Sequence, residues 1–374
     1  FVLIGQDSRD GAENQAIGGS FDDVIGNHQA DTAMIVQISA DRKEINLVSI
    51  PRDSLVDVPQ CETSKGTIPA QYNVMFNSIF AGAYKTGGDL SSAASCTLNA
   101  VNSLTGLNIQ NFIVVDFAGL VKMIDSVGGV DLCIPQNVND PYTGLNLDKG
   151  MHHLDGVAAT QYARIHGIGD GSDTSRTTRQ QYLIKQLMSE ALSKNLFTDT
   201  AQLYQLAKSA LKSLNISQGM ADTAALAGLA MSLKNFTMTN LQTQTVPVVP
   251  APSDPNRSVW TDEADNLWEK MRAGKPIFDT ADSNSGDSSD TSSDNSASSD
   301  DSGTTDSNQS DTTAETPDPV TGLITKSDGT LVDPSTGGTV DPDDGSIHDA
   351  TTGQYIGLAD RYLNATVCAV PAKN

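Results

Sequence analysis

The stretch FIVVDFAGLVKMIDSVGGVDLCIP, residues 112–135, decides the fold class. It opens with four apolar residues that favour a strand, and it closes with a second apolar run at residues 130–134. Between these runs, Asp116 is placed to N-cap a helix over residues 117–127, which Gly128 and Gly129 would end. A strand, a helix and a strand in direct succession are typical of a layered α/β domain.

The same alternation extends outward through residues 1–277. Apolar runs predict further strands at residues 1–5, 32–39, 44–50 and 242–249. Helical spacing of apolar residues predicts helices at residues 74–84, 90–104, 156–165, 176–194, 200–214, 221–233 and 262–273. Because residues 40–43 form a turn that joins two strands as a hairpin, we expect a three-layer α/β/α domain with a mixed central sheet.

The last quarter of the chain has a different composition. Residues 278–316 consist mainly of Ser, Asp, Thr, Asn and Gly. Such a segment buries too little apolar area to offset its ordering entropy, so we expect a disordered acidic linker. Residues 317–374 contain three turn-like strings: DPVTG at 318–322, DPSTG at 333–337 and DATTG at 349–353. These strings predict a small β-rich C-terminal tail of short hairpins or a meander.

The charge of the chain restricts its partners. The formal net charge of the 374 residues is −23, with 23 basic against 46 acidic side chains. A polyanion of this kind repels nucleic acid and anionic lipid heads, so neither is expected as a partner. A phosphate-binding site must therefore be a local basic cluster in a negative background. The sequence contains no run of 18 apolar residues that would span a membrane.

Four cysteines indicate the redox environment: Cys61, Cys96, Cys133 and Cys368. Their even number and wide spacing are typical of two disulfides in an oxidising compartment, although four buried thiols would be the alternative. Cys61 and Cys96 both lie between the strands at 44–50 and 112–115, so we pair them with each other. This leaves Cys133 for Cys368, which would tether the tail to the domain. The sequence alone allows three pairings.

Three short strings place polar residues at strand ends. GQDSR follows the first strand at residues 5–9, QADT precedes the second at 29–32, and SIPRDS follows the third at 49–54. If the first and third strands are parallel neighbours and the second runs antiparallel, all three strings meet at one edge of the sheet. Strand-end loops are where α/β domains assemble their sites. Each acidic residue alone is more simply read as a cap or a turn.

A fourth string, YARIHGIGDGSDTSRTTRQQ at residues 162–181, concentrates basic side chains. Arg164 and His166 leave the end of a predicted helix, and Asp173 or Ser175 would cap the next one. Arg176, Arg179 and Gln180 share one face of its first turns. A helix start with guanidinium donors beside it suits a pyrophosphate, since both features bind phosphate oxygens. An exposed helix face with ordinary surface arginines is the alternative.

Two aspartates in these strings are candidate metal ligands. Asp7 and Asp31 offer hard carboxylate oxygens, and Mg²⁺ is usually held by one or two carboxylates together with water and substrate oxygens. Mn²⁺ would suit the same donors. A cation beside an arginine cluster favours phosphoryl transfer, which depends on charge neutralisation and on positioning of an attacking hydroxyl.

Taken together, the strings GQDSR, QADT, SIPRDS, DFAGLVKMIDSVGGVDLCIP and YARIHGIGDGSDTSRTTRQQ resemble the LytR-CpsA-Psr family in its actinobacterial form, over about residues 1–275. The resemblance implies an α/β/α fold with a long hydrophobic pocket for a polyprenyl chain. It implies an enzyme, a phosphotransferase that moves a glycan polymer from a polyprenyl-pyrophosphate carrier to peptidoglycan. This reaction takes place on the outer face of the cytoplasmic membrane, so we expect an anchor that precedes Phe1.

The resemblance also assigns roles to residues. Arg52, Arg164, Arg176 and Arg179 are the expected catalytic arginines, and they bind the pyrophosphate together with His166 and Gln180. Asp7 and Asp31 are the expected ligands of Mg²⁺. Candidates for the pocket wall are Val74, Phe76, Ile79, Phe80, Phe112, Phe117, Leu120, Leu183 and Leu187, for each of which ordinary core packing is the competing interpretation.

Two departures from the family pattern lower the positive charge of the site. Gln29 and His166 stand where the family usually has arginine. They keep a second function open, namely a non-catalytic module that binds polyprenyl-pyrophosphate glycans. A transcriptional role is disfavoured, because the chain has disulfide-type cysteines and no basic face for DNA.

Overall fold

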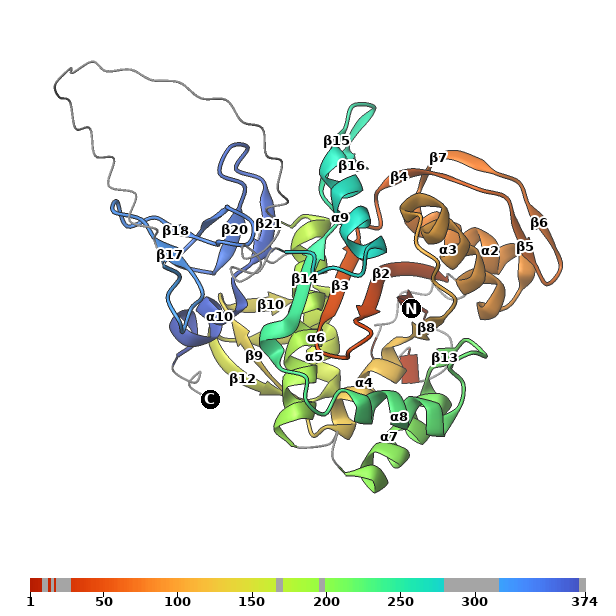
Figure 1. Cartoon of the computed structure of the whole chain (residues 1–374), viewed down its shortest axis with the longest axis horizontal. Helices are drawn as coiled ribbons and strands as arrows, with labels where there is room; N and C mark the ends of the chain where they lie inside the picture. Colours follow the sequence, from red (N-terminus) through yellow and green to blue (C-terminus); the bar gives the residue numbers. More distant parts are fainter. Residues whose placement is uncertain are drawn as a thin grey trace, which may run out of the picture.

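A computed structural model describes residues 1–8, 13–14, 17, 28–165, 171–194, 199–278 and 316–369 (Figure 1). Six strands form its central sheet, in the order β13 (Asn215–Ile216), β8 (Phe112–Val115), β1 (Val2–Asp7), β2 (Gln29–Ile38), β3 (Ile45–Ile50) and β14 (Leu241–Thr245). β8 pairs with β1 in parallel, as β14 does with β3, whereas β2 is antiparallel to both β1 and β3. The predicted mixed sheet is confirmed.

The expected adjacency of the first and third strands is wrong. β2 lies between β1 and β3 and pairs with both. Since β1 and β3 are each antiparallel to β2, they still point the same way. The ends of β1 and β3 and the start of β2 therefore reach one edge of the sheet, as the three polar strings require.

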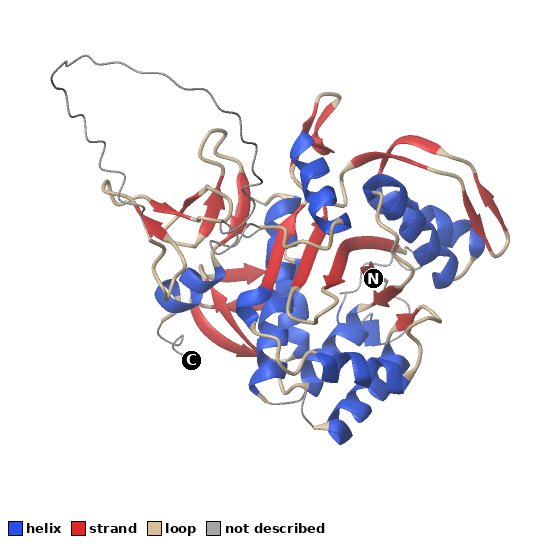
Figure 2. Ribbon diagram, viewed as in Figure 1, coloured by secondary structure: helices blue, strands red, loops and turns tan. Residues whose placement is uncertain are grey.

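Helices cover both faces of this sheet, which gives the predicted three layers (Figure 2). On one face, Ile4 and Val48 pack into a large core with α2 (Phe76–Gly87), α3 (Leu90–Thr105) and α9 (Asp262–Arg272). On the other face, Met34 and Leu47 pack against α6 (Asp173–Ser193) and the residues that follow α8 (Thr223–Ser232). α4 (Phe117–Ser126), α5 (Gly156–Arg164) and α7 (Thr200–Ser213) complete the domain.

Aspartate caps fix most of the helix starts. The side chain of the N-cap aspartate accepts a hydrogen bond from a backbone N–H of the first turn, which satisfies a donor that the helix itself leaves unpaired. This capping is the predicted role of Asp116, and α4 ends at two glycines with positive φ, also as predicted. The aspartates that cap α3, α4, α5, α7 and α8 are Asp89, Asp116, Asp155, Asp199 and Asp222.

Several short ribbons were not predicted. β4 (Leu55–Val58) pairs with β7 (Gln71–Met75), and β5 (Cys61–Thr63) pairs with β6 (Gly66–Ile68), which together make one long arm. The helix expected at 74–84 begins at Phe76 because the two residues before it belong to β7. β9 (Val130–Ile134) pairs with β12 (Gly150–Leu154), and β10 (Val138–Asp140) pairs with β11 (Leu145–Leu147). β15 (Val248–Ala251) pairs with β16 (Asp254–Trp260), so the strand expected at 242–249 is in fact two.

The C-terminal tail is a five-stranded antiparallel meander, as the turn-like strings predicted. Its strands are β17 (Ile324–Thr325), β18 (Leu331–Val332), β19 (Thr339–Val340), β20 (Ser346–His348) and β21 (Tyr355–Leu358). In each string the aspartate carboxylate accepts from the N–H and the hydroxyl of the threonine three residues later. The glycine that ends each string has positive φ. The predicted disorder of the linker concerns residues 279–315, which lie outside the described residues.

The tail docks onto the domain beside α6, on the opposite side of the molecule from α2 and α3 (Figure 1). After β21 come α10 (Asp360–Tyr362) and a π-helical turn at Leu363–Val367. Leu363 is fully buried against side chains of α6, and the Nζ of Lys185 lies 2.9 Å from a carboxylate oxygen of Asp360. Both predicted disulfides form, namely Cys61–Cys96 and Cys133–Cys368. In the part of the chain that the structure describes, the helices are too short or too polar to cross a bilayer.

Candidate active site

A bulge in the central sheet brings the two candidate metal ligands together. The β1–β2 register places Gly5 opposite Thr32 and Gln6 opposite Ala30, so Asp31 is the extra residue. A bulge redirects one side chain out of the strand's alternation. Asp31 and Thr32 consequently both face the same pocket, together with Asp7 at the end of β1. Gly5 is required here, because a Cβ atom would approach the Cβ of Thr32 to 2.9 Å.

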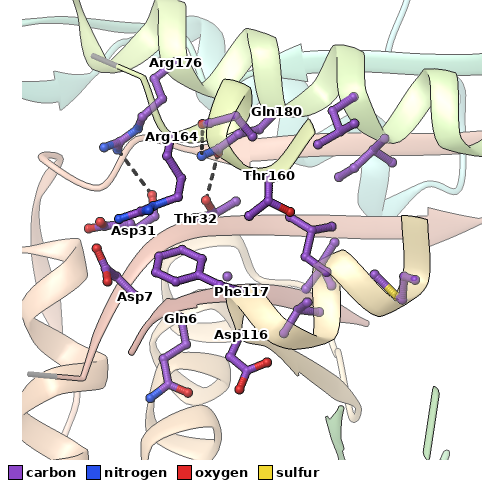
Figure 3. Close-up of a pocket in the computed structure, with 18 of the residues that line it drawn as sticks. Gln6, Asp7, Asp31, Thr32, Asp116, Phe117, Thr160, Arg164, Arg176 and Gln180 are labelled. Carbon is purple, nitrogen blue, oxygen red and sulfur yellow. Dashed lines mark hydrogen bonds between the residues drawn. The ribbon is translucent and has the colours of Figure 1, made fainter. Parts of the chain in front are cut away.

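This pocket lies between the sheet and helices α4, α5 and α6, and its volume is about 740 Å³. In Figure 3, Arg176 and Gln180 reach into it from α6, while Asp7 and Asp31 lie at the same end as Arg164. One end is therefore charged. The rest of the wall is mostly apolar, and its apolar members are Leu3, Met34, Val115, Phe117, Leu120, Met123, Ala163, Leu183, Ile184 and Leu187. Asp116, Asp140, Thr143 and Thr160 also line the pocket. A cavity of this size with a mostly apolar surface and a limited number of polar groups is typical of a ligand-binding site.

Arg164 is held at the end of α5 by an aromatic ring. Its guanidinium carbon lies 4.1 Å from the centre of the Phe117 ring, within the range of a cation–π interaction. An Nη atom donates to the carbonyl oxygen of Ile17 at 3.1 Å. Because Phe117 begins α4 directly after the cap at Asp116, the same helix start that the sequence predicts also fixes the direction of this arginine.

The first turns of α6 bury two arginines. The N-cap is Ser172, whose hydroxyl accepts from the N–H of Ser175, so the expected cap at Asp173 or Ser175 is wrong. Asp173 instead occupies the first turn, where a carboxylate complements the helix dipole, and it forms an ion pair with Arg176. Burial raises the pKa of Asp173 above its ordinary value, against the opposing effect of Arg176 and Arg52. Arg176 is only 3% exposed and also donates to the backbone oxygen of Asp31 at 3.3 Å.

Arg179 lies deeper, one turn further along the helix. Its Nη atoms donate to the hydroxyl of Ser175 at 2.8 Å and to the carbonyl oxygen of Ile165. It does not line the pocket. Burial raises the pKa of the neighbouring Tyr162 to about 12, although the charge of Arg179 acts in the other direction. Arg179 therefore ties α6 to the end of α5, where Arg164 stands.

Arg52 stands behind the pocket wall. Its Nη1 donates to Asp31 Oδ1 at 3.1 Å, and its Nε lies 3.3 Å from Asp173 Oδ1 and 3.6 Å from Asp53 Oδ2. Burial alone would lower the pKa of Arg52, but the carboxylates of Asp31, Asp173 and Asp53 raise it above its ordinary value. The string SIPRDS thus contacts the string QADT through Asp31, and it contacts the string at residues 162–181 through Asp173.

The structure brings most of the predicted site residues together. Five of them line the pocket: Asp7, Asp31, Arg164, Arg176 and Gln180. Gln180 accepts from the hydroxyl of Thr32 at 2.8 Å, which links α6 to β2. Arg52 does not line the pocket but contacts Asp31, which does, whereas Arg179 contacts Ser175 and Ile165 outside the lining. His166 lies outside the described residues. Gln29 is paired opposite Asp7.

The predicted pocket wall is partly wrong. Phe117, Leu120, Leu183 and Leu187 line the pocket as expected. The other five candidates belong to the packed core with α2 and α3, on the opposite face of the sheet: Val74, Phe76, Ile79, Phe80 and Phe112. A strand or helix with apolar spacing shows that a face is buried, but the spacing is the same whether the burial is against a packed core or a cavity.

Three contacts of the site are not among the predictions from the sequence. Asp173 was considered only as a cap, whereas it bridges Arg52 and Arg176. Its position three residues before Arg176 was the available signal, because such residues lie on one helix face. The hydrogen bond between Thr32 and Gln180 joins residues 148 positions apart, and no local pattern predicts it.

The sequence model of the LytR_cpsA_psr family matches residues 1–273, which contain all of these site residues. The chain belongs to this family. The family assignment covers the α/β/α domain and stops before the linker and the tail, which begin after the last matched residue.

Similar proteins from other bacteria are known by name. The chain is 29% identical over 280 residues to a probable cell wall biosynthesis protein, LcpB of Corynebacterium glutamicum, which covers 73% of this chain and 60% of LcpB. It is 27% identical over 259 residues to the cell wall biosynthesis protein LcpA of the same organism, which covers 66% of this chain and 49% of LcpA. The chain thus spans about half to three fifths of the length of these relatives.

A solved structure has the same fold. The crystal structure of TagV from Bacillus subtilis superposes with a TM-score of 0.53 at 18% identity, and the match covers 74% of this chain and 98% of TagV. The curated TagV sequence is named a polyisoprenyl-teichoic acid–peptidoglycan teichoic acid transferase, and it is 27% identical over 251 residues, 65% of this chain and 58% of TagV. The likeness in structure concerns the fold of the LytR-CpsA-Psr domain.

Proposed function

We propose that this LytR-CpsA-Psr protein is a transferase that moves a glycan polymer from a polyprenyl-pyrophosphate carrier onto peptidoglycan, at the outer face of the cytoplasmic membrane. The observation that carries the proposal is the pocket, which has arginines and aspartates at one end and an apolar wall along the rest. A lipid pyrophosphate has the same two parts. The names of the similar proteins, which include a teichoic acid transferase, support this choice of substrate.

The reaction is a phosphoryl transfer. A hydroxyl oxygen of peptidoglycan forms a bond to the phosphorus atom that carries the glycan. The bond between that phosphorus and the bridging oxygen breaks, so polyprenyl phosphate leaves, and the hydroxyl proton passes to solvent. Such a reaction gains most from positioning and from neutralisation of the phosphate charge.

The site residues divide into direct and indirect roles. Arg164, Arg176 and Gln180 line the pocket and are proposed to contact the pyrophosphate oxygens. Guanidinium groups suit this task, because their fork of donors matches two phosphate oxygens. Arg52 and Arg179 do not line the pocket: Arg52 contacts Asp31, and Arg179 ties α6 to the end of α5. His166, two residues after Arg164 in the sequence, is proposed as a further pyrophosphate-binding residue.

The two aspartates are suited to a divalent cation. Asp7 and Asp31 supply hard oxygens from neighbouring strands of one pocket, a donor set that fits Mg²⁺ or Mn²⁺ with water and phosphate oxygens as further ligands. The described residues hold no group of three or more His, Cys, Asp or Glu side chains placed for a metal, so the substrate would complete the coordination. A bound cation supplies charge neutralisation at the phosphates.

The apolar wall is proposed to take the polyprenyl chain. Side chains of α4 and α6 face each other across the pocket, among them Leu120 and Leu187. Each buried methylene group stabilises a bound lipid by about 0.8 kcal/mol, so a chain of several isoprene units would bind by this wall alone. The lipid would thereby hold the pyrophosphate at the charged end.

The test is turnover of a polyprenyl-pyrophosphate glycan with a peptidoglycan acceptor, followed by release of polyprenyl phosphate. We expect product with Mg²⁺, none with EDTA, and a large loss in Arg179→Ala. Binding of the lipid without release under all conditions would contradict the enzyme and support the glycan-binding module that Gln29 and His166 keep open.

A further inference from the structure

The guanidinium of Arg52 is shared by three carboxylates. Nη1 contacts Asp31 at 3.1 Å, whereas Nε faces Asp173 at 3.3 Å and Asp53 at 3.6 Å. Of these, only Asp31 lines the pocket. Arg52 thus forms an ion pair with one of the two carboxylates proposed to hold the divalent cation, from the side that faces away from the pocket.

The guanidinium of Arg52 and a divalent cation would therefore compete for the carboxylate of Asp31. A divalent ion at Asp31 would stand beside a guanidinium already bonded to Oδ1 of that residue. Both side chains are about three quarters buried, at 24% exposure for Arg52 and 23% for Asp31. Solvent screens charges at such a depth only in part, so the repulsion between the two cations lowers the affinity for the metal.

The arrangement lets Arg52 give up Asp31 without losing all of its partners. Its Nε remains near Asp173 and Asp53, which are tied in turn to Arg176 and Arg257. Release of Nη1 breaks one ion pair of three. A phosphate group in the pocket would then replace Asp31 as the partner of Nη1, because the carboxylate that separates Arg52 from the pocket would have moved to the metal.

We propose that Arg52 is a built-in competitor of the divalent cation at Asp31, so that the metal binds tightly only together with the pyrophosphate that takes over the guanidinium. Arg52 then contacts the substrate phosphate only once the metal has taken Asp31, and it couples metal binding to substrate binding. The inference rests on the proposed function, because it assumes that Asp7 and Asp31 hold the cation. Coupling of this kind between two ligands typically amounts to about 5- to 150-fold in affinity.

The test is the affinity for Mn²⁺ alone, measured by calorimetry on the full chain without any phosphate compound. We expect Arg52→Gln to bind Mn²⁺ at least about fivefold more tightly than the wild type, which is the lower end of typical coupling. Asp31→Asn should lose the binding. Arg257→Gln is the matched control: this arginine contacts Asp53 at 3.0 Å in the same network but does not contact Asp31, so its affinity should equal that of the wild type.

The outcomes separate the inference from the proposed function. Equal or weaker Mn²⁺ binding by Arg52→Gln, with loss in Asp31→Asn, would overturn the competition but keep the metal site. An absence of Mn²⁺ binding in the wild type and in Arg52→Gln would overturn both the metal site and the inference. If Arg52→Gln does not fold, the guanidinium NMR signal of Arg52 in the wild type serves instead. It should shift on addition of Mg²⁺, and a signal that does not move would contradict the proposal.

Discussion

The two faces of the central sheet differ in what they pack against. The face toward α2 and α3 is a solid core, in which Phe76 and Phe80 are almost wholly buried. The face toward α4 and α6 leaves a pocket of about 740 Å³ between side chains of the same apolar types. The comparison teaches that hydrophobic spacing reports burial, while the distance between the sheet and its covering helices decides whether that burial is a core or a binding site.

The charged end of the pocket face should show the largest effect. Arg176→Ala removes one of the two arginines that pair with Asp173 and one of the three proposed donors to the phosphates. We expect turnover to fall by about 10²- to 10³-fold, as for the removal of other donors to developing charge. Loss of one partner of a buried ion pair should also lower the free energy of unfolding by about 3–5 kcal/mol. Kinetics on the lipid substrate and thermal unfolding measure the two effects. Arg257→Ala, whose side chain is 34% exposed, is the control and should keep normal turnover.

A pair of truncations tests the difference between the faces directly. Phe80→Ala opens a cavity in the packed core and should cost about 3–5 kcal/mol of stability. Leu187→Ala enlarges a space that already exists, so it should cost less than the about 2–5 kcal/mol that is usual for a fully buried leucine. Denaturant unfolding gives both values. If Leu187→Ala proved as costly as Phe80→Ala, the pocket would be filled in solution and the contrast between the faces would be lost.

The two disulfides lie in different parts of the molecule. Their removal should lower the free energy of unfolding by different amounts. Cys61–Cys96 closes a loop with a sequence separation of 35 beside α3, and Cys133–Cys368 closes one of 235 that ties the tail to the pocket side. Chain entropy predicts losses of about 4 and about 5 kcal/mol, so the Cys133→Ser, Cys368→Ser pair should be the less stable. Thermal unfolding of the two double variants decides the order. The reverse order would mean that the tail contributes little to the pocket face.

The smallest predicted effect is a change in the pH dependence of stability, at a histidine of the β9–β12 ribbon. The imidazole of His153 donates a hydrogen bond to the carboxylate of Asp131, which raises the pKa of His153 because the carboxylate favours the charged ring. The stabilisation is therefore fully present below the pKa of the unfolded chain and disappears as the pH rises through the higher pKa of the folded chain. The pair is exposed, so it contributes at most about 1 kcal/mol. His153→Gln should flatten this part of the stability profile, which begins near the ordinary histidine pKa of about 6.5 and extends to higher pH. An unchanged profile would contradict the pairing.

Much of the fold follows from local patterns. The strand at 112–115, the cap at Asp116 and the glycines at 128–129 are where the sequence places them, because capping and positive φ depend on a few neighbouring residues. The short ribbons at residues 55–75 were missed. Their strands have three to five residues, and β5, β6 and β7 contain no fully buried residue, so they leave little apolar alternation to detect.

The candidate site also has features that local sequence patterns predict and features that they do not. The residue types at the ends of the strands and at the start of α6 follow from the sequence, and they already predict that carboxylates and guanidinium groups meet at one edge of the sheet. The bulge at Asp31, the bridge that Asp173 makes between Arg52 and Arg176, and the opening of the pocket toward α4 and α6 depend on the three-dimensional arrangement. The physical reason is range: caps, turns and strand ends are set by adjacent residues, whereas a cavity and an ion-pair network depend on how elements far apart in the chain approach one another.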